Sequence, residues 1–154
     1  MAAATPRRRK LGTTNRLLLA EALPALVLAS LAVKLVPFRR VAALASRPVR
    51  RRAVAADPAY LRKMRWAVEA WGKRAPWRAV CFQRGLALHW MLRRRGIASI
   101  LHYGVAKDGE AGLRAHVWVS VDGRDVIGGE EATGFAQVAS FPAPARSPAQ
   151  GAEP

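Results

Sequence analysis

Cys81 is the only cysteine in the chain, and it opens the apolar run "CFQRGLALHWML". We expect a central helix within residues 75–96, with Cys81 at its N-terminus. Backbone N–H groups and the helix dipole at that end favour a thiolate, and Arg78 and Arg84 add positive field. A lone cysteine is also commonly a small buried residue, so Cys81 is a candidate nucleophile with a structural alternative. One cysteine excludes an internal disulfide and a cysteine-rich zinc site.

His116 is the matching candidate base. It lies in "AHVWVSV" (115–121), where valines alternate with polar or aromatic residues, as they do in a half-buried strand. A thiolate on a helix and an imidazole on a strand together form a Cys–His pair, an arrangement used for nucleophilic catalysis. The alternative for His116 is a strand histidine with a satisfied hydrogen bond. We interpret His89 and His102 as structural.

The elements around these residues change from helical to extended periodicity after Gly96, which is a natural helix C-cap. An antiparallel hairpin is expected around Asp122-Gly123, a strong two-residue turn. Helices followed by antiparallel strands define an α+β fold, with the Cys-bearing helix packed on a small sheet. The predicted segments are a basic disordered tail (1–13), one domain (14–141, helical over 14–96 and sheet over 97–129) and a disordered tail (142–154).

The N-terminal segment 16–38 is apolar and follows a basic stretch, as a signal peptide does. Glu21, Pro24 and Lys34 interrupt it, and its uncharged run of 12 residues is short of the roughly 20 that span a membrane. We favour a helix of the domain, bent or restarted at Pro24. An interfacial helix on an anionic membrane is the second interpretation, because basic clusters flank the segment. A cleaved signal is the third.

The charge balance favours an anionic partner. The chain has 26 Lys and Arg against 10 Asp and Glu, a formal net charge of +16. A nucleic acid, an anionic membrane surface and an acidic peptide all fit this charge. The chain carries no recognised DNA- or RNA-binding motif, so a nucleic-acid partner is not expected, although such a module remains one alternative function. A peripheral membrane or scaffold protein without catalysis is the other.

The stretch "CFQRGLALHWMLRRRGIAS", a strand, and then "AHVWVSVDGRDVIGG" resembles the transglutaminase-like cysteine proteases. It is most similar to the leader peptidase of lasso-peptide biosynthesis, the B protein in its separate protease form. The resemblance covers roughly residues 14–141 and is most specific over 77–129. Val117 replaces the Ala that follows the histidine in that family.

The resemblance implies a peptidase without a cofactor or a metal. Cys81 would attack the bond between leader and core of a lasso precursor peptide, and His116 would hold the thiolate and protonate the leaving amine. It also implies two partners: a separate leader-recognition protein, and an ATP-dependent cyclase that uses the released amine. We expect a cytoplasmic protein, with membrane association of residues 16–38 left open.

The resemblance further implies an acid that orients His116. Where many relatives carry Asp in the returning strand, this chain has Gly128. We favour Glu131, which keeps the strand parity and lies diagonal to His116, with Glu130 next. The alternative is that both are exposed charges beside the site.

Two aspartates fit this role less well. The hairpin register places Asp122 roughly 20 Å along the strand from His116, and Asp125, which faces Ser120, roughly 13 Å away. The same register makes His116 face Gly129.

Overall fold

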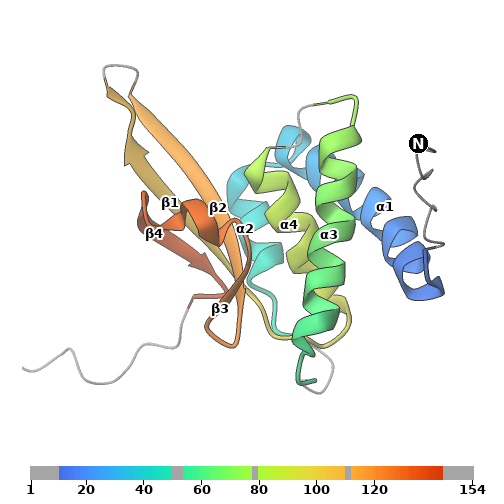
Figure 1. Cartoon of the computed structure of the whole chain (residues 1–154). Helices are drawn as coiled ribbons and strands as arrows, with labels where there is room; N and C mark the ends of the chain where they lie inside the picture. The colour runs from blue at the N-terminus through green and yellow to red at the C-terminus, as the bar shows by residue number, and fades with distance from the viewer. Residues whose placement is uncertain (1–10, 50–53, 78–79, 110–111, 144–154) are drawn as a thin grey trace, which may run out of the picture.

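The computed structural model describes residues 11–49, 54–77, 80–109 and 112–143 of the chain. The expected α+β class is confirmed, with the four longer helices on one side of the molecule and the sheet, together with one short helix, on the other (Figure 1). The elements are α1 (Thr13–Leu35), α2 (Phe38–Ala45), α3 (Pro58–Arg74), α4 (Cys81–Arg94), β1 (Ile100–Lys107), β2 (Leu113–Val121), β3 (Arg124–Ile127), α5 (Gly129–Ala132) and β4 (Ala136–Phe141). Of the predicted tails, residues 1–10 and 144–154 lie outside the described residues, and α1 begins inside the first.

Helix α1 is continuous through Pro24, so the helix does not restart there. One of its faces packs on α3 and α4. The indole N–H of Trp71 donates to the carbonyl oxygen of Leu19 over 2.9 Å, and Glu21 pairs with Arg95 at the end of α4. These polar contacts fix α1 against the domain, because each joins residues far apart in sequence and lies partly out of water.

Helices α3 and α4 have the expected ends. Asp57 caps α3 by accepting a hydrogen bond from the backbone N–H of Ala59, and Pro58 is its first residue. Helix α4 starts at Cys81 itself and ends before Gly96, whose φ of +81° suits glycine. The start of α4 has no side-chain cap, so its first N–H groups lack that partner.

Four antiparallel strands form the sheet in the order β3-β2-β1-β4. The hairpin turn between β2 and β3 is confirmed, with positive φ at both Asp122 and Gly123. The predicted sheet over 97–129 lacked β4, which pairs with β1 at the opposite edge. Its sequence, "AQVASF", alternates too weakly and too briefly to stand out from a loop.

The returning strand is shorter than expected. The β2–β3 register shifts by a bulge, so Val119 pairs with Ile127, where β3 ends. Gly128, with φ +77°, then turns the chain into the short helix α5. The expected pairing of His116 with Gly129 is therefore wrong, because Gly129 is the first residue of a helix.

Helix α4 packs closely on β2, and a glycine makes this possible. A Cβ at Gly85 would lie only 2.8 Å from Cγ1 of Val117 and 3.3 Å from a methyl of Leu101. As the alternation of 115–121 predicted, the valines of β2 join the core beneath α4. The strand is not half-buried, however, because His116, Trp118 and Ser120 are buried as well. The close approach of the helix brings the N-terminus of α4 to the edge of β2 that bears His116.

Candidate active site

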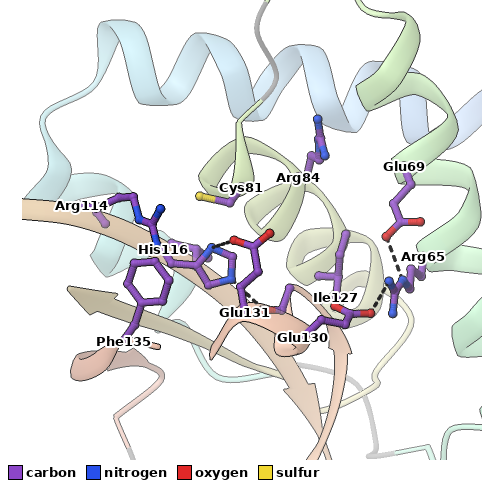
Figure 2. A pocket seen from close by; sticks show the side chains of 13 residues that line it. Arg65, Glu69, Cys81, Arg84, Arg114, His116, Ile127, Glu130, Glu131 and Phe135 are labelled. Atoms are coloured by element: carbon purple, nitrogen blue, oxygen red, sulfur yellow. Dashed lines mark hydrogen bonds and ion pairs between the residues drawn. The ribbon is translucent and has the colours of Figure 1, made fainter. Parts of the chain in front are cut away.

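Cys81 and His116 line the same pocket, an open cavity of about 490 Å³ at the start of α4. Figure 2 shows the thiol at the first turn of α4 and the imidazole of His116 on β2 below it. In the part of the chain that the structure describes, no hydrogen bond joins the two side chains. Because Cys–His contacts are often loose before substrate binds, the shared pocket keeps Cys81 and His116 as candidates for a catalytic pair.

The tautomer of His116 is set by its hydrogen-bond partner. Its Nε2 lies 2.7 Å from the carbonyl oxygen of Gly128. A carbonyl oxygen only accepts, so Nε2 carries the hydrogen, and Nδ1 of the neutral ring is left unprotonated. The edge of the ring that bears Nδ1 is turned toward the start of α4 (Figure 2). Nδ1 is therefore the ring nitrogen that is free to accept a proton.

Aromatic side chains hold the imidazole in place. The rings of His116 and Trp118 are stacked at an interplanar angle of 16°, and Phe135 lies 4.9 Å from the imidazole centroid on a tilted plane. His116 is only 6% exposed. The guanidinium of Arg114 lies over the ring of Phe135 at 5.2 Å. This packing leaves the imidazole one orientation, with one nitrogen on Gly128 and the other toward the pocket.

Glu131 lies beside His116, but on a helix rather than on the strand assumed from parity. Its Oε2 is 3.9 Å from Nδ1, and its side chain is 74% exposed. Nδ1 of the neutral ring and a carboxylate oxygen are both acceptors, so their contact becomes favourable only when His116 is protonated. The Gly128 carbonyl oxygen binds the other ring nitrogen, Nε2, where an orienting acid would bind.

Glu130 lines the same pocket and is held by helix α3. Arg65 binds Glu130 at 2.5 Å through Nη2 and Glu69 at 2.8 Å through Nε. A hydrogen bond from its own backbone N–H, and then the one from Arg65, hold the pKa of the Glu130 carboxyl below its usual range. Glu130 thus anchors α5 to α3, and its side-chain hydrogen-bond partner in the described part of the chain is Arg65 rather than His116.

The two aspartates lie away from the pocket. Asp122 is at the hairpin turn, and Asp125 is opposite Ser120, as the register predicted. Neither is among the residues that line the cavity around Cys81. Three contributors to the site were missed in the sequence: the Gly128 carbonyl, Phe135 and Arg65. Only Gly128 gave a signal, because a glycine stood where relatives carry the acid.

The other histidines make hydrogen bonds outside this pocket. His89 is fully buried, with Nε2 2.9 Å from the Ala45 carbonyl oxygen and Nδ1 2.9 Å from Ser99 Oγ. Burial lowers its pKa to about 4, so the ring is neutral near pH 7. His102 contacts Gln137 and Ser120 and stacks on Trp118, and burial lowers its pKa as well.

The pocket supports covalent catalysis by its own side chains. Arg84, one turn after Cys81, lines the same cavity, but its side chain lies against Gly72 of α3 and points away from the thiol (Figure 2). Arg78, which was also expected to add positive charge, lies outside the described residues. Within the described ranges no three His, Cys, Asp or Glu side chains are grouped as a metal site requires.

The comparison with known families agrees with this geometry. The family model of the transglutaminase-like superfamily matches residues 23–140, which is most of the chain. The protein therefore belongs to the transglutaminase-like superfamily, whose members generally have cysteine peptidase or transglutaminase activity. No curated protein and no solved structure matches the chain.

Proposed function

We propose that the protein is a cysteine peptidase that removes the leader from a lasso-peptide precursor. The observation that carries the proposal is the shared pocket of Cys81 and His116, with His116 held in one tautomer by Gly128. Membership of the superfamily supports a Cys–His mechanism. The lasso substrate is supported by the sequence resemblance over residues 77–129.

The proposed mechanism uses Cys81 as the nucleophile and His116 as the base. Nδ1 of His116 takes the proton of the Cys81 thiol, and the thiolate attacks the carbonyl carbon of the leader–core bond. Free N–H groups at the start of α4 stabilise the oxyanion. The imidazolium then protonates the leaving amine, which becomes the N-terminus of the core peptide. The leader remains on Cys81 as a thioester.

Hydrolysis completes the cycle. His116 takes a proton from water, the hydroxide attacks the thioester, and the leader leaves with a free carboxylate while the thiol recovers its proton. Glu131 faces Nδ1 and stabilises the ring during each protonated stage. In this scheme the Gly128 carbonyl orients the His116 ring, and Glu131 supplies the negative charge. In the family pattern a single acid has both roles.

The proposal includes two partner proteins and a compartment. A separate leader-recognition protein delivers the precursor, and an ATP-dependent cyclase uses the new amine to close the ring. The basic surface attracts an acidic leader or partner, and this attraction weakens as salt rises. The reaction takes place in the cytoplasm, where the precursor is made.

The direct test is mass spectrometry of candidate precursors incubated with the protein and the leader-recognition partner. We expect two products, a leader with a free C-terminal carboxylate and a core peptide with a free amine. Cys81→Ala should abolish cleavage and keep the fold, because this change removes little volume. Normal cleavage by Cys81→Ala would refute the cysteine mechanism, and a leader coupled to an added amine would show acyl transfer instead of hydrolysis.

A second test needs no substrate, because the chain has one cysteine. Iodoacetamide reacts with the thiolate, so the rate of Cys81 alkylation against pH reports on the Cys–His pair. His116→Ala should lower alkylation near neutral pH and reduce cleavage by about 10³-fold or more. His102→Ala, also on the sheet but outside the pocket, is the matched control. If only His102→Ala changed both rates, His102 would be the base.

A further inference from the structure

Helix α1 has a second apolar face that the domain leaves uncovered. Its buried face carries Leu18, Ala22, Leu26 and Ala29. The opposite face presents large apolar side chains that are 47% to 75% exposed, together with Pro24. These residues form the leucine stripe, defined as Leu17, Leu28, Leu31 and Leu35.

The spacing of these residues makes them one continuous surface. From Leu17 through Pro24 to Leu35 the exposed positions recur in steps of three, four or seven, which keeps them on one side of the helix. A helix of 23 residues is about 35 Å long, so the stripe is an extended line of leucines. A helix that is apolar on all sides belongs in a protein interior or in lipid, and here only one side meets protein.

The charges around the stripe are positive. Arg16 lies beside its first leucine, and Lys34, Arg39 and Arg40 lie beside its last residues, all exposed. The only carboxylate before Asp57 is Glu21. Glu21 is turned into the domain, where Arg94 binds it at 3.2 Å and Arg95 binds both of its oxygens. The stripe is thus bordered by exposed cations, and the carboxylate nearest to it is neutralised.

We propose that the leucine stripe docks this protein on an anionic lipid membrane, as a helix lying flat in the headgroup region. The line of leucines matches the apolar acyl layer of a membrane, and the cations at both of its ends match anionic headgroups. By length and composition alone, α1 is also able to cross a membrane. Crossing is opposed by its buried face, since Trp71 and Trp77 bind its Leu19 and Ser30 at 2.9 Å each.

This inference is independent of the proposed protease activity. It concerns a surface built by α1 and the start of α2, whereas the Cys81 pocket is built by α3, α4, β2 and the α5 region. A membrane contact would fix the orientation of the enzyme without adding a group to the site.

The test is flotation of the full chain with two kinds of vesicle: pure phosphatidylcholine, and phosphatidylcholine with about one third phosphatidylglycerol. We expect binding to the anionic vesicles and little to the neutral ones, with less binding as salt rises. Leu28→Glu/Leu31→Glu should weaken vesicle binding by about tenfold or more, because two negative charges would enter the apolar contact between the stripe and the membrane. Replacing Arg39 and Arg40 by Ser should also weaken it.

The matched control is Leu113→Glu/Val138→Glu, which adds the same charge at exposed apolar residues of the sheet. It should float like the wild type, and thermal unfolding should show that both double variants keep the fold. Failure of the wild type to float, or equal flotation of the two double variants, would overturn the proposal. So would a dimer in sedimentation that Leu28→Glu/Leu31→Glu dissolves without any vesicle binding, because the stripe would then bind a second copy.

Discussion

Replacing Gly128 with alanine tests the central feature of the site, a backbone carbonyl that binds His116, the proposed base. Gly128 has φ +77°, a region in which an alanine costs about 1–2 kcal/mol. A Cβ there would lie 2.6 Å from the carbonyl oxygen of Val117 and 3.2 Å from Cα of Trp118. Both atoms belong to the backbone of β2, which at these two residues is paired with Tyr103 and His102 of β1 and is therefore held in place.

The Gly128 peptide must therefore shift, and its oxygen moves away from His116 Nε2. Overpacking adds about 1–3 kcal/mol to the backbone term, so the free energy of unfolding should fall by about 2–5 kcal/mol. The loss of orientation should reduce cleavage by roughly 100-fold, since a displacement of about 1 Å in a catalytic group has effects of this size.

Gly123→Ala is the matched control for this prediction. Gly123 has φ +74°, but a Cβ there meets no atom within 4 Å, so only the backbone term applies. Thermal unfolding should place Gly123→Ala between the wild type and Gly128→Ala. The rate of Cys81 alkylation against pH, and nitrogen NMR of labelled His116, should change in Gly128→Ala alone. Equal melting temperatures of the two variants, with normal alkylation and cleavage in Gly128→Ala, would refute the orienting role of the carbonyl.

Contacts around the site and in the core give three further predictions. Glu131→Gln should lower cleavage by less than about tenfold, because an exposed carboxylate at 3.9 Å is largely screened; a loss near 10⁴-fold would make Glu131 the orienting acid. Because the folded-state pKa of His89, about 4, lies below the ordinary 6.5, the folded state binds fewer protons between these values. The free energy of unfolding should therefore fall as pH drops from about 6.5 to about 4, by up to roughly 3 kcal/mol, and denaturant titration of His89→Ala should lack this His89 contribution. Gly85→Ala should lower the free energy of unfolding by about 1–3 kcal/mol, because its Cβ would meet Val117 at 2.8 Å; an unchanged melting temperature would contradict the close packing of α4 on β2.

Much of the fold could be predicted from local sequence, because its signals act over a few residues. Asp57 and Pro58 start α3, Gly96 ends α4, and Asp122-Gly123 makes the hairpin. Each depends on capping or on the permitted φ of one or two residues, which the chain specifies locally. The alternation of 115–121 likewise determined which side of β2 meets the core.

Other features depended on contacts between distant segments. Strand β4 is defined by pairing with β1 more than by its own weak pattern, and α1 stays continuous at Pro24 because α3 and α4 support it. The bulge opposite Val119 changes the register by one residue. The alternation of side chains along a strand therefore could not place the residues after Ile127, because the strand ends there and a helix follows.

The sequence by itself determined the residue types of the site, a single cysteine at a helix start and a histidine on a strand. It also determined that Gly128 stands where the family pattern has an acid. Only the tertiary structure decided the role of that glycine: its positive φ turns the chain so that its carbonyl meets Nε2 of His116 at 2.7 Å. The same turn brings Glu131 to the other nitrogen, on a helix. Backbone carbonyls carry no sequence signature, so this assignment required the coordinates of two segments that are adjacent only in the folded chain.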